Sequence, residues 1–70
     1  MINVKLAQIP GPLNEYALNE GATVSTLLEV SGKAVPSGYG LKVNGVAADV
    51  TQTLKEGDKV FIVTEAKGNA

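Results

Sequence analysis

Apolar and polar residues alternate in two short runs near the start of the chain. Residues 2–6 read Ile-Asn-Val-Lys-Leu, and residues 13–18 repeat the alternation more weakly. A period of two is typical of a strand with one face buried. Between the runs, the Pro-Gly-Pro sequence of residues 10–12 favours a turn, because proline fixes φ and glycine adopts left-handed conformations. The pattern predicts an antiparallel hairpin.

The period of the apolar residues changes in the next segment. Val24, Leu27 and Leu28 follow the spacing i, i+3, i+4, which gives one apolar stripe on a short helix. Thr23 is suited to cap the start of this helix, and Gly32 is suited to end it in a left-handed conformation. A helix of about two turns is not stable alone, so we expect it to pack against a sheet.

The second half of the chain contains further strand signals. Asn44-Gly45 is a strong short signal for a two-residue hairpin. Near the end, Val-Phe-Ile-Val is an unbroken apolar run that suits a strand buried on both faces. We expect a loop over residues 33–40, then a strand over 41–43 and its return strand over 46–48. A turn region with a buried Leu54 would follow over residues 51–57, and a final strand over 59–64.

The predicted order is therefore β-β-α-β-β-β, which is an α+β arrangement. One main helix would pack on one face of a mixed sheet of four to five strands. The first and last strands are the most apolar, so we expect them to be central neighbours, as in a β-grasp fold. Residues 1–66 would form this single domain. Residues 67–70 have nothing to bury, so we expect a flexible C-terminal tail.

Composition and charge exclude several kinds of function. The 70-residue chain is 44% hydrophobic, and it contains no Cys and no His, which excludes disulfides, the usual zinc sites and a histidine-activated serine. We therefore expect no cofactor, no metal and no enzymatic activity. The net charge is −1 and there is no Arg, which argues against a nucleic-acid partner. No apolar run is long enough for a membrane span and no signal peptide opens the chain, so we expect no membrane partner and a cytoplasmic location.

The final strand offers a candidate protein-binding surface. If its even-numbered residues face the helix, alternation places Phe61 and Val63 on the opposite face of the sheet. Their expected neighbours there are Lys5 and Lys42. The lysine stems could simply cover the apolar side chains. Alternatively, an apolar centre rimmed by lysines could bind a partner protein.

Three segments carry a resemblance to a known family. They are Gly-Ala-Thr-Val running into Leu-Leu, Val-Asn-Gly, and Leu-Lys-Glu-Gly-Asp-Lys-Val, at residues 21–28, 43–45 and 54–60. In order and spacing they resemble the ThiS and MoaD sulfur-carrier family, which is ubiquitin-like, along nearly the whole chain. The resemblance implies a β-grasp fold. It also implies a protein partner such as an E1-like activating enzyme or a synthase.

The end of the sequence departs from that family. Family members act through a tail ending in Gly-Gly, whose carboxylate is adenylated and then carries sulfur. Here Gly68 is in register with the first glycine, Asn69 stands in place of the second, and Ala70 follows. The resemblance thus implies partner contacts at Gly68 and Asn69, while the terminal Gly-Gly is missing.

Three functions follow from these observations. The first is a non-catalytic, ubiquitin-like binding module that contacts its partner through the sheet face or the tail. The second is a sulfur carrier for molybdopterin or thiamine thiazole biosynthesis with an atypical or processed C-terminus. The third is a small structural or assembly subunit that adds an exposed edge strand to a partner's sheet.

Overall fold

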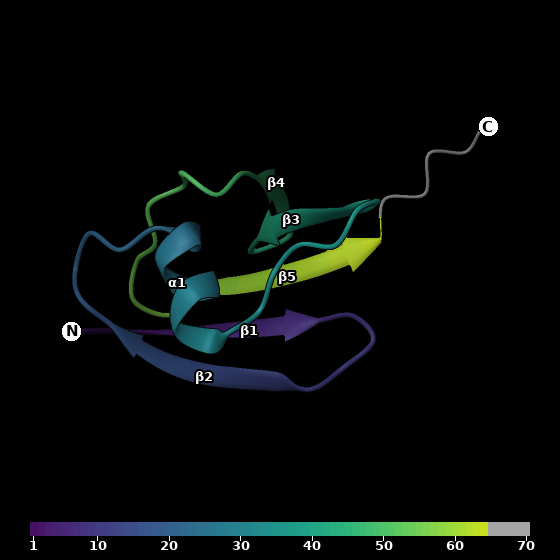
Figure 1. Ribbon diagram of the computed structural model, residues 1–70. Helices are drawn as coiled ribbons and strands as arrows, with labels where there is room; N and C mark the ends of the chain where they lie inside the picture. Colours follow the sequence, from purple (N-terminus) through teal and green to yellow (C-terminus); the bar gives the residue numbers. More distant parts are fainter. Residues whose placement is uncertain (65–70) are drawn as a thin grey trace.

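The computed structural model describes residues 1–64, and within them the chain forms five strands and one helix (Figure 1). The predicted order β-β-α-β-β-β is confirmed. The elements are β1 (Ile2–Gln8), β2 (Leu13–Leu18), α1 (Val24–Ser31), β3 (Tyr39–Val43), β4 (Val46–Ala48) and β5 (Lys59–Thr64).

The five strands form one mixed sheet with the order β2-β1-β5-β3-β4. β1 and β5 are parallel neighbours at the centre, and the other neighbouring pairs are antiparallel. α1 lies across one face of this sheet (Figure 1). The expected central position of the first and last strands is confirmed, because the most apolar strands occupy the positions with a neighbour on both sides.

Local sequence signals explain most of the turns and ends. Asn44 and Gly45 both adopt positive φ, 55° and 87°, as a tight two-residue hairpin turn requires. Thr23 caps α1: its hydroxyl accepts a hydrogen bond from the Thr26 N–H, and the Thr26 hydroxyl accepts one from the Thr23 N–H, each at 3.4 Å. Gly32, at φ 73°, ends the helix as predicted.

Two boundaries differ from the sequence prediction. β1 continues to Gln8, two residues further than the alternation indicated, and β3 begins at Tyr39, so the predicted loop ends at residue 38. In both places the extra residues pair with β5: Gln8 lies opposite Ile62, and Tyr39 lies opposite Thr64. Pairing with a distant strand extended these elements, and no local signal encodes it.

The core lies between α1 and the sheet. Its buried members come from every element except β4, together with two loop residues, one of them the predicted Leu54: Ile2, Val4, Leu6, Leu18, Ala22, Val24, Leu27, Leu41, Val43, Leu54, Val60 and Ile62. None of the residues from 1 to 64 is a buried polar or charged one. Truncations in this layer therefore remove purely apolar contacts.

Candidate docking surface

The sheet face away from α1 has no second layer among the residues that the structure describes. On β5, Val60 and Ile62 are fully buried toward the helix, whereas Phe61 and Val63 point the other way and are half-buried. The expectation that β5 is buried on both faces is therefore wrong for the face away from α1. Alternation assigns the remaining residues of this surface, called the open face below: Lys5, Ala7, Leu13, Glu15, Lys42 and Lys59 with Phe61 and Val63.

An apolar row crosses the open face at Phe61. Ala7 lies directly opposite Phe61 on one side, and Leu13 lies opposite Ala7 on the next strand. Only 2% of Ala7 is exposed, although it does not belong to the helix-side core. The small alanine is shielded by its two larger neighbours, of which Leu13 remains 43% exposed. The open face thus has a small apolar cluster of its own.

Lysines border this cluster on three adjacent strands. Lys42 lies directly opposite Phe61 on β3, and Lys5 lies opposite Lys59, two residues before Phe61 on β5. The charge opposite Lys5 on β2 is Glu15. No lysine ammonium takes part in a side-chain hydrogen bond within residues 1–64. An exposed pair such as Lys5 and Glu15 contributes only about 0–1 kcal/mol, so these charges are available to a partner.

The structure brings together four of the residues that the sequence placed at this site. Phe61, Val63, Lys42 and Lys5 share the open face, although Lys5 lies two residues along β1 from Ala7, the residue opposite Phe61. The remaining two, Gly68 and Asn69, lie outside the described residues.

Sequence reasoning missed four members of the open face: Ala7, Leu13, Glu15 and Lys59. Each lies an even number of residues from an identified residue on its own strand, or opposite such a strand, so alternation could have placed it on the same face. What it lacked was the register between β1 and β5, which places Ala7 beside Phe61.

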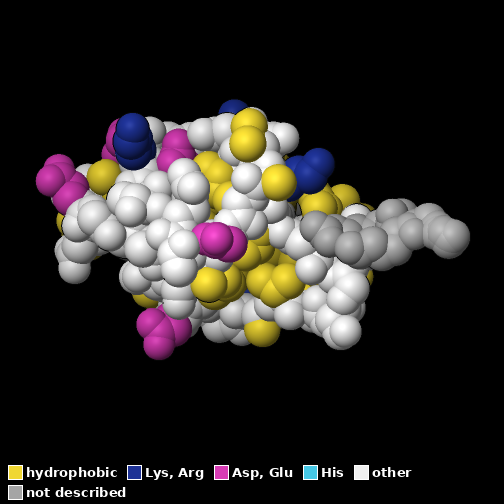
Figure 2. Space-filling model, turned by 90° about the horizontal axis from the view of Figure 1, so that it is seen from above, with side chains coloured by type: hydrophobic (Ala, Val, Ile, Leu, Met, Phe, Trp, Pro, Cys, Tyr) yellow, Lys and Arg dark blue, Asp and Glu magenta, His cyan; other side chains and the backbone are white. Residues whose placement is uncertain are grey.

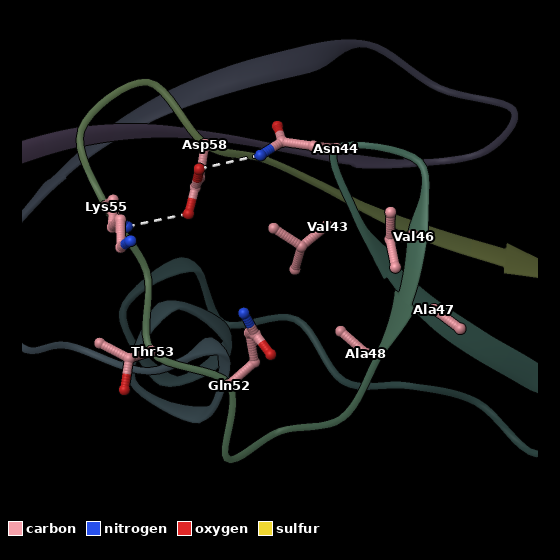
Figure 3. Close-up of a pocket in the computed structure, with 9 residues that line it drawn as sticks. All are labelled: Val43, Asn44, Val46, Ala47, Ala48, Gln52, Thr53, Lys55 and Asp58. Atoms are coloured by element: carbon pink, nitrogen blue, oxygen red, sulfur yellow. Dashed lines mark hydrogen bonds between the residues drawn. The ribbon is translucent and has the colours of Figure 1, made fainter.

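A depression of about 380 Å³ lies between the β3–β4 hairpin and the segment that precedes β5 (Figure 3). On its polar side, the Asp58 carboxylate accepts hydrogen bonds from Asn44 Nδ2 at 2.9 Å and from the Lys55 N–H at 2.8 Å. Asn44 Oδ1 in turn accepts from the Lys59 N–H at 3.0 Å. These groups hold the hairpin against the loop, so the polar side of the depression serves the fold.

The molecule seen from the β4 side shows apolar side chains gathered at the centre, with acidic and basic side chains around them (Figure 2). Val46, which is 69% exposed, contributes to the wall of the depression. In the portion from residue 1 to 64, no group of three or more Asp, Glu, His or Cys side chains is placed to hold a metal ion. No helix in that portion has the length and apolar character needed to cross a membrane.

No protein-family model and no curated protein sequence matches the chain. Solved structures do match its fold. Small archaeal modifier protein 1 of Haloferax volcanii superposes with a TM-score of 0.76 at 12% identity, covering 91% of this chain and 98% of that one. A protein described as molybdopterin converting factor, subunit 1, from Pyrococcus furiosus gives 0.74 at 21% identity, with the same coverage.

A ubiquitin of Caldiarchaeum subterraneum gives a TM-score of 0.60 at 21% identity and covers 97% of this chain and 98% of its own. The fold is the ubiquitin-like β-grasp. The predicted fold class is thereby confirmed, with five strands and one helix on one face. The chain therefore shares the ubiquitin-like β-grasp architecture of these proteins, and identities of this size extend the likeness to the fold alone.

Proposed function

We propose that this chain is a non-catalytic, ubiquitin-like protein that binds a protein partner through its open face. The observation that carries the proposal is the position of Phe61. Its ring lies on the sheet face opposite α1, between Ala7 and Lys42, and it is half-buried. A partner would complete the burial of a ring that its own fold covers only in part.

The composition of the open face supports this role. Large aromatic side chains at the centre of a surface dominate binding energies, because their burial removes much apolar area from water. Lys5, Lys42 and Lys59 surround the apolar cluster and would guide a partner with acidic groups at the same spacing. The competing interpretation is that the lysine stems only shield Phe61.

The substitution Phe61→Ser separates the two interpretations. If Phe61 is a binding residue, we expect the variant to fold as before and to lose affinity by about thirtyfold or more, because central aromatic residues contribute about 2 kcal/mol or more. The matched control is Val46→Ser, which changes an even more exposed apolar residue on β4 to the same polar one.

Both variants and the unchanged chain would be immobilised and exposed to extract from the native cell, and captured proteins would be quantified by mass spectrometry. A partner retained by the unchanged chain and Val46→Ser but lost by Phe61→Ser supports the proposal. The same captured set for all three would refute it. Loss of cooperative unfolding in Phe61→Ser would show that the ring belongs to the folding core.

A sulfur-carrier role is the second candidate, and the likeness to the molybdopterin converting factor subunit favours it. In that role Gly68 and Asn69 would enter the partner's site and the terminal carboxylate would carry sulfur. An intact-mass measurement of the protein from its native cell tests this directly. Exchange of a terminal oxygen for sulfur, on the full or a trimmed chain, would support the carrier. If the terminus is unmodified and an activating enzyme does not adenylate it, the binding module alone is favoured.

A further inference from the structure

The two edges of the sheet are unequal. β4 has three residues, whereas β2 has six. Strand edges expose unpaired N–H and C=O groups, and proteins protect them with short strands, proline, lysine or bulges. β2 contains neither proline nor lysine, and its pairing with β1 runs from Leu18 to Leu13 without a bulge. Its long edge thus lacks the protection that shortness gives to β4.

The hydrogen bonds of β1 reveal which groups of β2 face outward. The Lys5 N–H donates to the Asp58 carbonyl and the Ile9 N–H donates to the Ile62 carbonyl, each at 2.9 Å. The N–H and C=O of one strand residue point to the same side, so the odd-numbered residues of β1 bond to β5 and the even-numbered ones bond to β2. The even-numbered partners on β2 are Leu18, Tyr16 and Asn14.

It follows that Leu13, Glu15 and Ala17 direct their N–H and C=O groups away from the sheet. Within residues 1–64, these six groups take part in none of the turn, loop or side-chain hydrogen bonds. The same reasoning applied to the other edge gives a single outward residue. The Asn44 N–H donates to the Lys59 carbonyl, so Lys42 bonds to β5 while Leu41 and Val43 bond to β4. Their partners Ala48 and Val46 therefore point inward, and only Ala47 of β4 points outward.

We propose that the β2 edge binds an extended segment of a partner protein, which adds a sixth strand with a basic residue opposite Glu15. Glu15 is the one charged residue of β2, and oppositely charged residues across a strand pair attract. The neighbouring positions of the added strand would lie beside Tyr16 on the helix side, where an apolar β-branched residue fits. Backbone bonds would supply affinity and these side chains would supply selectivity.

A second copy of the chain is a poorer occupant. Its β2 edge would present another Glu15 and no basic residue, and like charges across a strand pair are destabilising. The inference goes beyond the proposed open-face function and does not depend on Phe61. The two can therefore fail independently.

The probe is the capped synthetic peptide Thr-Val-Lys-Val-Thr, titrated into the labelled full chain and followed by amide NMR. We expect the amide signals of Leu13, Glu15 and Ala17 to move most, because these N–H groups gain hydrogen bonds, while Asn14 and Tyr16 already bond to β1. Replacing the peptide's lysine with glutamate should weaken binding about two- to fivefold. With the Glu15→Lys protein this preference should reverse.

Two further changes test the backbone contacts. Methylating the backbone nitrogen of the peptide's lysine removes the hydrogen bond that this N–H would donate to the Glu15 carbonyl, and it leaves the protein unaltered. Ala17→Pro removes one outward N–H and leaves the bonds between β1 and β2 intact, a position where an edge strand tolerates proline. Each change should weaken binding about fivefold, the value of one hydrogen bond of about 1 kcal/mol.

Several results would overturn the inference. One is the absence of shifts at millimolar peptide, and another is shifts centred on the open face. Unchanged binding by the methylated peptide would also count against strand pairing, whether or not Ala17→Pro folds. Shifts of the β2 amides on concentrating the chain alone would assign the edge to a second copy. Phe61→Ser should bind the peptide normally, which separates this result from the open-face test.

Discussion

Leu27→Ala tests how the fold is held together, because Leu27 is one of the two buried residues of the short helix. It is fully buried and belongs to the core cluster. α1 has eight residues, about two turns, and a helix of that length does not persist without packing. Removing the side chain should therefore loosen the helix as well as leave a cavity.

The magnitude follows from the size of the domain. At about 0.05–0.15 kcal/mol per residue, the described 64 residues would have a free energy of unfolding of roughly 3–10 kcal/mol. A buried Leu→Ala substitution costs about 2–5 kcal/mol. With a urea dependence of about 1 kcal/mol per molar, the midpoint of unfolding should fall by about 2 M or more, and a partly unfolded population is expected at 37 °C.

Val30→Ala is the matched control. Val30 lies on the same helix but is 58% exposed, and alanine is the better helix former. Its urea midpoint should equal or slightly exceed that of the unchanged chain, as measured by circular dichroism. Equal effects of the two substitutions would refute the assignment of the buried helix face. An unchanged midpoint in Leu27→Ala would show that α1 adds little to the core.

Two further substitutions probe the loops. Asn44→Ala should lower the free energy of unfolding in urea by about 1–3 kcal/mol, because it removes two side-chain hydrogen bonds and strains a left-handed position. Asn44→Gly tolerates the same backbone conformation, so its smaller loss measures the hydrogen bonds alone. Equal losses in the two variants would contradict this reasoning. Hydrogen bonds from the Thr51 hydroxyl and, to a lesser extent, from the Thr51 N–H hold the pKa of Asp49 below its ordinary value of 3.8. The charged carboxylate therefore stabilises the fold above pH 3.8, and this stabilisation is lost as the pH falls through the lowered pKa. Thr51→Val should raise the pKa of Asp49 toward 3.8 in a carboxyl-carbon NMR titration, and an unchanged pKa would assign the effect to the N–H alone.

The elements that the sequence predicted correctly have short-range causes. The hairpin at Asn44 and Gly45 depends on two residues that tolerate positive φ. The helix from Val24 begins at a threonine cap and ends at Gly32, both adjacent to the apolar stripe. Such signals operate within a few residues, so they can be recognised in a single sequence.

The missed features have long-range causes. Ala7 and Lys59 belong to the open face because β1 and β5 pair in parallel, although the two strands are about fifty residues apart in the chain. A parallel register is fixed by the crossover and by packing against α1, and no adjacent turn sets it. Alternation therefore assigned Phe61 to the correct face, while the identity of its nearest neighbour on β1 required the structure.

The segments that resemble sulfur carriers turn out to contact one another. Asn44 of Val-Asn-Gly bonds to Asp58, and the Leu54 N–H donates to the Ala22 carbonyl at 2.8 Å. All three segments thus meet around the loop that precedes β5. Their residues are explained by the fold itself. The resemblance could therefore predict the β-grasp architecture, and it left the docking surface to be found from alternation and burial.

The open face and the β2 edge are contiguous, because Leu13 and Glu15 belong to both. Their side chains lie on the open face, and their backbone groups point out of the sheet edge. A strand added at β2 would extend the row that runs through Ala7 to Phe61. One partner could then pair with the edge and cover the ring at the same time. In that case Phe61→Ser and Ala17→Pro would weaken the same complex together, whereas two separate partners would each respond to one substitution only.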